Sequence, residues 1–398
     1  MMISVYKKPP LPKAIKSFCR VQGRFFQKES LAAGGKRTML RLIDRNGKWI
    51  KLAVSVVFIS ALFLINHCSD RGQKPGNLME IHGSTMGTTY MVKIVKPDDK
   101  KFSSGDVLTQ RVTADIENLL KKVNQQMSNW IEDSEISRFN RYKESQWFEV
   151  SPETVLVIVE ALRVSKESNG AFDITVGPLV NLWGFGPPGT ARQIPAEEQI
   201  KKTMEEIGYQ KLSVRLSPPA IKKEEPGIYC DLAAIAKGFG VDQVAEYLES
   251  RGFSHYLVEI GGEVRAKGLN HENQIWRVAI ASPDPFSGSP YRKIIGLKDA
   301  SMATSGDYFN YFEKDGVRYS HTIDPSTGRP ITHKLASVTV IHESCMTADA
   351  MATAINVLGP GKGYDLAIKE NLAVFMIVRG QDGFQENMTS RFEEMMRR

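Results

Sequence analysis

The sequence contains few cysteines, and they form no pattern that would bind a metal. Only four occur among 398 residues, and none belongs to a Cys-x-x-Cys pair or a zinc-ligand spacing. Two of them, Cys230 and Cys345, lie in the main body of the chain. An oxidising compartment would allow these two to form a disulfide, but spacing alone leaves open whether they pair. A thiolate metal centre and a Cys-x-x-Cys redox centre are therefore excluded.

The common nucleotide-binding signatures are also missing. The stretch GIYCDLAAIAKGFG at 227–240 is predicted to be a strand that breaks into the start of a helix, with an acid at Asp231 and a base at Lys237. It matches neither the P-loop nor the dinucleotide GxGxxG pattern. The free amide groups at the start of a helix attract anions, so phosphate binding is still a reasonable expectation here.

The positive net charge of the chain comes from its N-terminal segment. The whole chain carries +7, whereas residues 1–51 contain 13 Lys or Arg against Glu29 and Asp44, so they contribute +11 and the rest −4. A mildly acidic body gives no electrostatic case for nucleic acid. We therefore expect no nucleic-acid partner.

An uncharged apolar run of 14 residues, LAVSVVFISALFLI, follows this basic segment at 52–65. This length is typical of a signal-peptide core, and the preceding positive charges hold the N-terminal side in the cytoplasm. We predict a basic cytoplasmic leader at 1–51, a signal peptide or membrane anchor at 52–68, a linker at 69–78 and a folded domain at 79–398. The domain is then expected on the periplasmic side of a bacterial inner membrane.

The form of the membrane attachment has two readings. Cys68 lies where a bacterial lipoprotein carries its lipid, although the residues before it are not the usual small ones. The alternative is an uncleaved N-terminal helix that anchors the chain. The start codon is open as well, because Met39 would leave a shorter basic segment than Met1 does.

The body mixes helical and strand periodicities, which predicts an α+β fold in a single mixed domain. A small-residue turn at Gly83–Thr88 is expected to join two strands, with a polar loop at 128–140 and a glycine-rich loop at 170–186. The predicted helices span 112–127, 151–170 and 241–252, and the predicted strands span 256–260, 277–281, 336–341 and 372–378.

A candidate cation site lies near the C-terminus, in SCMTADAMATA at 344–354. If Thr347 caps a helix that begins at Ala348, Asp349 lies in the first turn and Thr353 follows on the same face. Such a pair of oxygen donors suits Mg²⁺, which completes its shell with phosphate and water. The alternative is a plain N-capped helix in which Asp349 only complements the helix dipole.

Eight short motifs, taken in chain order, resemble the ApbE family of flavin transferases. They are MGTTY, SEISRFN, GAFDITVGPL, DLAAIAKGFGVD, IGGEV, TSGDY, HTIDPSTGRP and TADAMATA, and they extend over nearly the whole body. The resemblance implies a T-fold-like ApbE domain behind the signal or anchor segment. It also implies an FAD:protein FMN transferase, which uses Mg²⁺ to transfer FMN from FAD to a Thr or Ser hydroxyl of another protein and releases AMP.

The resemblance also implies site residues. Asp349, Thr353 and the backbone carbonyl of Ala234 would hold Mg²⁺, and His321 would accept the proton of the acceptor hydroxyl, with Asp307 assisting. Trp130 stands where family members often have Tyr, and it would stack on the flavin. The residues implied in FAD binding are Met86, Trp130, Ala171, Phe172, Asp173, Asp231, Lys237 and Ile323.

Two other functions remain open at this point. Water in place of the protein hydroxyl would make the chain an Mg²⁺-dependent FAD pyrophosphatase that yields FMN and AMP. A non-catalytic FAD-binding lipoprotein is the second alternative, although such a protein has no need of both a metal and a base. For a transferase, the expected partner is a respiratory flavoprotein subunit, such as one of a Na⁺-pumping quinone reductase.

Overall fold

The computed structural model describes residues 77–97, 105–187, 192–283, 289–307 and 310–397. All of them belong to one compact unit, Lys74–Arg398. The leader at 1–51, the segment at 52–68 with Cys68, and most of the linker lie outside the described residues. Within the described part, no helix is long and apolar enough to cross a membrane.

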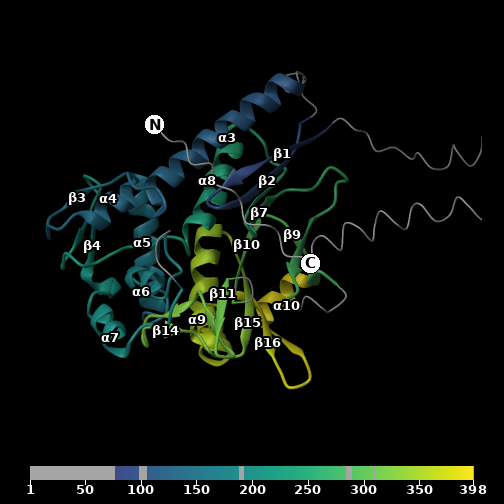
Figure 1. Ribbon diagram of the computed structural model, residues 1–398. Helices are drawn as coiled ribbons and strands as arrows, with labels where there is room; N and C mark the ends of the chain where they lie inside the picture. Colours follow the sequence, from purple (N-terminus) through teal and green to yellow (C-terminus); the bar gives the residue numbers. More distant parts are fainter. Residues whose placement is uncertain (1–76, 98–104, 188–191, 284–288, 308–309, 398) are drawn as a thin grey trace, which may run out of the picture. The chain divides into compact units, whose positions relative to one another are not determined.

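An antiparallel sheet of eight strands forms the centre of the body (Figure 1). Neighbouring residues of β6 pack on opposite faces of this sheet, with Val258 on one side and Leu257 on the other. In order across the sheet, the strands are β1 (Leu78–Thr85), β2 (Thr88–Val95), β6 (Tyr256–Ile260), β7 (Glu263–Lys267), β10 (Ala300–Gly306), β15 (Leu335–His342), β16 (Ala373–Arg379) and β17 (Phe384–Met388).

Helices cover one face of the sheet, and a hairpin with a short helix covers the other. The helices of the first face are α3 (Gly105–Met127), α8 (Ala236–Ser250) and α9 (Cys345–Lys369), and α5 (Pro152–Glu167) packs against α9. On the second face, Trp276 and Phe392 pack with strand residues such as Leu257. They come from the hairpin of β8 (Trp276–Ala281) and β9 (Tyr291–Leu297) and from α10 (Ser390–Met396).

Smaller elements flank the helical face. They are the three-stranded sheet of β3 (Phe148–Glu149), β5 (Ala220–Lys223) and β4 (Leu212–Arg215), the hairpins of β11 (Tyr311–Lys314) with β12 (Val317–Ser320) and β13 (Ile323–Asp324) with β14 (Arg329–Pro330), and α4 (Glu135–Arg141), α6 (Gly177–Leu182) and α7 (Glu197–Glu205). Figure 1 shows β3, β4, α4 and α7 to the left of α5, and β11 beside α9.

The predicted fold class is confirmed: the body is a single α+β domain with mixed helix and sheet. The strand predicted at 256–260 has the bounds of β6, and the other three predicted strands differ from β8, β15 and β16 by at most one residue at an end. Strong apolar runs bounded by glycine or polar residues fixed these strands.

Four local predictions are wrong. The loop predicted at 128–140 contains most of α4, because Ser134 caps a helix there through the Ser137 amide. The loop predicted at 170–186 contains α6, and residues 227–232 form no strand. The first hairpin turns at Met86 and Gly87, so β1 continues through the glycine at position 83.

The predicted start of the C-terminal helix is also wrong. Helix α9 begins at Cys345, and its cap is Ser344, whose hydroxyl accepts the Thr347 amide. Asp349 is therefore the fifth residue of the helix rather than part of its first turn. The two body cysteines, Cys230 and Cys345, are both free and buried, so they do not form a disulfide.

Candidate active site

Helices α8 and α9 approach each other closely at Gly238. A Cβ atom at this position would lie 2.3 Å from the carbonyl oxygen of Cys345 and 2.8 Å from the Cβ of Asp349. Only glycine permits this approach, because any other residue would collide with the backbone of α9. The contact brings the first turn of α8 against the predicted metal ligand Asp349.

Asp349 is buried and keeps one carboxylate oxygen free of hydrogen-bond donors. Its Oδ2 accepts the Gly238 amide at 2.9 Å, while its Oδ1 lies 3.9 Å from Nζ of Lys237. Burial raises the pKa of Asp349, and the neighbouring Lys237 charge opposes this rise only in part. Oδ1 therefore faces a cation without a direct hydrogen bond among the described residues.

Lys237 lies between two buried carboxylates. Its Nζ is 2.6 Å from Oε1 of Glu263, the first residue of β7, and 3.9 Å from Oδ1 of Asp349. Burial alone would lower the pKa of Lys237, but the charges of Asp349 and Glu263 outweigh it and hold this pKa above its ordinary value. Burial raises the pKa of Glu263, and the nearby Asp349 adds to the rise. When both carboxylates are ionised, two acids and one base carry an excess of one negative charge.

The carbonyl oxygen of Ala234 also lacks a hydrogen-bond donor among the described residues. Ala234 lies just before the N-cap of α8, Ile235, and is therefore outside the hydrogen-bond ladder of the helix. Its oxygen receives no backbone amide hydrogen from the part of the chain that the structure describes. Thr353 lies one turn beyond Asp349 on α9, and no hydrogen bond to its hydroxyl is present among the described residues.

These donors fit a hard divalent cation. They are Oδ1 of Asp349, the carbonyl oxygen of Ala234 and the hydroxyl of Thr353, and none of them accepts a hydrogen bond from the described residues. The described residues contain no group of three His, Cys, Asp or Glu side chains that could hold a metal. A cation with few protein ligands, which keeps water or phosphate in its shell, suits such a site better than zinc.

Asp173 has a structural role in the loop before α6. Its Oδ1 accepts the amide and the hydroxyl of Thr175 at 2.7 and 2.6 Å, and its Oδ2 accepts the Tyr209 amide at 2.9 Å. Burial raises the pKa of Asp173, and these three bonds oppose the rise. The carboxylate is thus occupied by its own loop, so any ligand contact of this loop falls to other atoms.

Asp231 joins that loop to the segment before α8. Its amide donates to the carbonyl of Ile174 at 2.7 Å, and its Oδ1 accepts the Ala233 amide at 2.9 Å. Burial raises the pKa of Asp231 as well. The Asp231 carboxylate and the open Ala234 carbonyl therefore belong to one short turn.

The apolar residues implied in FAD binding are mostly part of the core. Phe172 and Ile323 are buried, and Ala171 is half-buried. Met86 lies in the β1–β2 turn with φ +49°, and its Cε is 3.0 Å from where a Cβ of Gly240 would be. The hairpin turn therefore reaches over α8 one turn beyond Lys237.

Trp130 lies in the loop after α3 and exposes 63 % of its surface. It lines a cavity of about 640 Å³ together with Tyr229 and Arg141. The neighbouring Asn129 donates to the carbonyl of Cys230 at 3.2 Å, which fixes this loop beside the segment that carries Asp231. An exposed indole above a cavity offers a flat face for a stacked ring.

His321 follows β12 and has a defined tautomer. Its Nδ1 lies 2.9 Å from the carbonyl oxygen of Asn310, and a carbonyl can only accept, so Nδ1 carries the hydrogen and Nε2 is left as a proton acceptor. Desolvation lowers the pKa of His321, and the Asn310 bond opposes this in part. The charge of Lys237 adds to the lowering, which places the two side chains within electrostatic range.

Asp307 is held by an arginine. Arg379 binds its two carboxylate oxygens at 3.1 and 2.6 Å, and Arg318 donates to its carbonyl oxygen. Asp307 also raises the pKa of His321 through its charge. The geometry thus favours an electrostatic influence on His321 over proton transfer by Asp307 itself.

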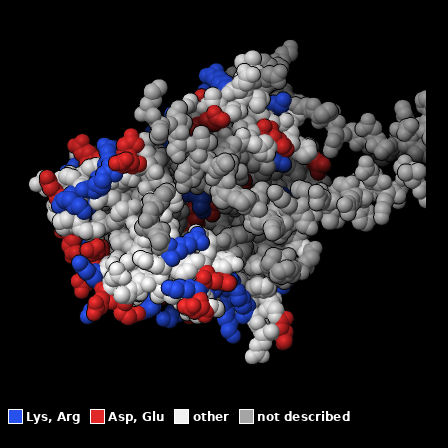
Figure 2. Space-filling model, viewed as in Figure 1, with Lys and Arg blue, Asp and Glu red and all other residues white. Residues whose placement is uncertain are grey.

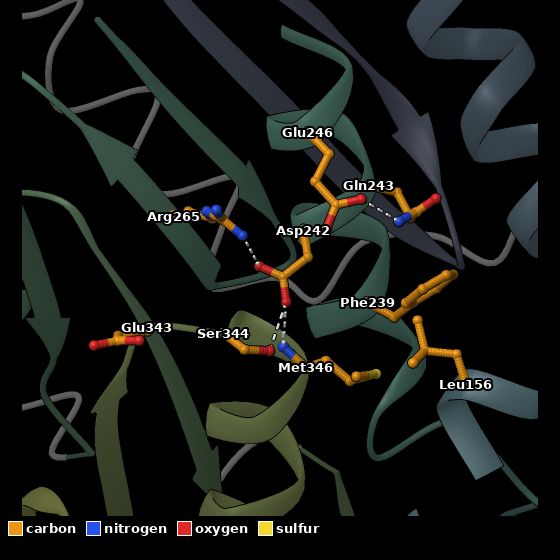
Figure 3. Close-up of a pocket in the computed structure, with 9 residues that line it drawn as sticks. All are labelled: Leu156, Phe239, Asp242, Gln243, Glu246, Arg265, Glu343, Ser344 and Met346. Carbon is orange, nitrogen blue, oxygen red and sulfur yellow. Dashed lines mark hydrogen bonds and ion pairs between the residues drawn. The ribbon is translucent and has the colours of Figure 1, made fainter. Parts of the chain in front are cut away.

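A second cavity, of about 270 Å³, lies at the start of α9 (Figure 3). The buried Asp242 of α8 points between Arg265 and the first turn of α9. It accepts the amides of Cys345 and Met346, both at 3.0 Å, and the hydroxyl of Ser344 at 2.8 Å. Arg265 binds it at 2.7 Å. Asp242 therefore caps α9 from a neighbouring helix.

The ApbE family profile matches residues 86–376. The chain belongs to the ApbE family. Relatives named FAD:protein FMN transferase include those of Vibrio cholerae, 44 % identical over 86 % of this chain and 98 % of the relative, and of Haemophilus influenzae, 41 % identical over 87 % and 98 %.

Solved structures of ApbE proteins match the fold. The flavin transferase ApbE of Vibrio cholerae has a TM-score of 0.73 at 43 % identity and covers 81 % of this chain and 100 % of its own. An ApbE protein of Thermotoga maritima gives a TM-score of 0.71 at 28 % identity, with 81 % and 100 % covered. The predicted family is therefore confirmed.

Sequence reasoning missed two residues of this site. Glu263 lies in the motif IGGEV and Asp242 ends the motif DLAAIAKGFGVD, so the ApbE motifs contained both. The spacing of neither residue showed which distant helix it would meet. Around the site, Figure 2 shows acidic and basic side chains interspersed on the visible face, with both signs inside a hollow near its centre.

Proposed function

We propose that the chain is a FAD:protein FMN transferase. Family membership and the name shared by its close relatives support this function. The observation that carries it is the buried Asp349, whose Oδ1 has no hydrogen-bond donor among the described residues while Lys237 lies 3.9 Å away. Such a cluster suits a diphosphate substrate with its cation.

Mg²⁺ is the proposed cation, with Asp349, Thr353 and the Ala234 carbonyl as its protein ligands. When bound, Mg²⁺ neutralises phosphate charge and lets a nucleophile approach phosphorus. Lys237 provides a second positive charge next to the same place, since its Nζ lies 3.9 Å from Asp349. The start of α8, directly after the Asp231 turn, is proposed to contribute backbone amides to the same phosphates.

His321 is the proposed proton acceptor. The hydroxyl of a Thr or Ser on the acceptor attacks the phosphorus of the FMN half of FAD, its proton passes to Nε2 of His321, and the bond to AMP breaks. The neutral tautomer fixed by Asn310 leaves Nε2 ready for this role. Asp307 supports His321 through its charge.

Trp130 is the proposed flavin platform. Its exposed ring borders a cavity large enough for part of a dinucleotide, and the Asn129 bond ties the loop to the Asp231 segment. Met86, Ala171 and the backbone atoms of Phe172, Asp173 and Ile323 complete the proposed FAD surface. We place the enzyme on the periplasmic side of a bacterial inner membrane, attached through Cys68 or an uncleaved helix, with a respiratory flavoprotein subunit as acceptor.

The direct test mixes the full-length chain in detergent with FAD, Mg²⁺ and a Thr-containing acceptor subunit, such as one from a Na⁺-pumping quinone reductase. Transfer adds the mass of one FMN to the acceptor, whereas hydrolysis releases free FMN and mere binding leaves FAD unchanged. We expect transfer by the wild type and none by Asp349→Ala. A matched control is Asp115→Asn, which removes a charge from an ion pair on α3 with Arg251. Full activity in Asp349→Ala would overturn the assignment of the site.

A further inference from the structure

Lys237 is not equally shared between the two acids beside it. Its Nζ makes a hydrogen-bonded ion pair with Oε1 of Glu263 at 2.6 Å but stays 3.9 Å from Oδ1 of Asp349. All three side chains are supplied by different elements, namely α8, β7 and α9. A lysine on a flexible stem would normally pair directly with a lone carboxylate this close.

The oxygens that remain free point to the reason for this arrangement. Oε2 of Glu263 is buried and has no hydrogen-bond partner, and Oδ1 of Asp349 has only the distant ammonium. Glu263 is 3 % exposed and Asp349 is 5 % exposed, so neither acid can be satisfied by bulk water. One lysine does not neutralise two such acids when both are ionised, so the site favours the binding of a further positive charge.

We infer that Glu263 is a positioning residue, which holds the Lys237 ammonium away from Asp349 so that the Asp349 carboxylate stays available to a divalent cation. Without Glu263, the ammonium would close on Asp349 and compete with the cation for Oδ1. This inference rests on the proposed function, since it concerns the proposed metal ligand.

A double-mutant cycle tests this role through Mg²⁺ binding rather than activity. Binding is measured on the full-length chain without FAD, by calorimetry and by the rise of the unfolding temperature with Mg²⁺ concentration. We expect Glu263→Gln to raise the dissociation constant for Mg²⁺ about tenfold. Glu263→Asp keeps the charge and only shortens the side chain. A severalfold rise of the Mg²⁺ dissociation constant in this variant would show that the position of the carboxylate matters as well as its charge.

The second arm of the cycle removes the lysine. In a Lys237→Met background no ammonium can close on Asp349, so adding Glu263→Asp is expected to change the dissociation constant by less than about twofold. The matched control is Glu249→Gln, which breaks the Lys267–Glu249 pair, also between α8 and β7 and 2.7 Å long, away from Asp349. Its Mg²⁺ affinity is expected to equal that of the wild type.

The outcomes separate this inference from the proposed function. Unchanged Mg²⁺ affinity in Glu263→Asp, or an equal loss with and without Lys237, overturns the positioning role while the metal site stands. A wild type that binds no Mg²⁺ overturns both. The unfolding temperature without Mg²⁺ is compared across all variants, and Glu263→Asp serves as the informative variant if Glu263→Gln does not fold.

Discussion

The amide of Gly238, in the first turn of α8, donates to the carboxylate of Asp349 in α9 at a distance of 2.9 Å. Gly238 is the third residue of α8, whose first amides have no carbonyl partner within the helix, so the Asp349 carboxylate satisfies one of them and is oriented by it. This contact also requires glycine, because a Cβ would meet the Cys345 carbonyl oxygen at 2.3 Å. One residue without a side chain thus brings the start of α8 against the proposed metal ligand Asp349.

Gly238→Ala is therefore expected to destabilise the protein and to weaken Mg²⁺ binding. Forcing α8 and α9 apart should lower the free energy of unfolding by about 1–3 kcal/mol. The control is Gly361→Ala, also within a helix, where an added Cβ meets nothing within 4 Å. Denaturant unfolding measures the free energy of unfolding of both variants. An unchanged free energy of unfolding in Gly238→Ala would contradict the close contact.

Asp242→Ala is expected to loosen the start of α9. The variant loses the acceptor for the Cys345 and Met346 amides and leaves Arg265 with one partner fewer, which should lower the free energy of unfolding by about 3 kcal/mol. The control is Glu246→Ala, one turn later in α8, whose hydrogen bond is to Gln243. Its effect should stay below about 0.5 kcal/mol. Equal effects in the two variants would count against the cap.

The rate of transfer is expected to depend on the protonation of His321. Its pKa lies below the ordinary value of 6.5, so the imidazole remains the neutral proton acceptor at neutral pH. As the pH falls through this lowered pKa, Nε2 becomes protonated and kcat should decline, while kcat should not change on the alkaline side through this group. The pH profile of kcat for FMN transfer measures this decline on its acidic side.

His321→Ala should lower kcat by about 100-fold or more and remove the acidic limb of that profile. His321→Gln is a useful companion, because an amide can keep a hydrogen bond to the Asn310 carbonyl yet cannot accept the proton. A variant that keeps the wild-type profile would show that another group takes the proton.

Trp130→Ala is expected to weaken FAD binding with little effect on folding. The ring is 63 % exposed, so its removal costs little core packing, whereas loss of a stacking platform should cost about 1–3 kcal/mol of binding free energy. Trp130→Tyr keeps an aromatic face and should bind almost as the wild type does. Quenching of flavin fluorescence measures both affinities, and equal affinity in Trp130→Ala would exclude the platform.

Much of the fold and part of the site could be predicted from local patterns. The strand at 256–260 is a short apolar run that ends in two glycines, and this pattern is independent of distant residues. Asp349 and Thr353 lie four residues apart on one helix, so their shared face also followed from the sequence. The start of that helix did not, because both Ser344 and Thr347 are good caps. Asp242, about a hundred residues earlier, binds the first amides and decides in favour of Ser344.

The sequence by itself determined the family and the α+β class, since these depend on ordered motifs and on local periodicity, and it predicted the oxygen donors of the proposed metal site. Only the tertiary structure decided which charges meet. Lys237, Glu263 and Asp349 come from three elements, and their distances follow from the order of strands in the sheet and from the contact at Gly238. Such long-range packing depends on how all the elements bury their apolar faces together, which no local pattern contains.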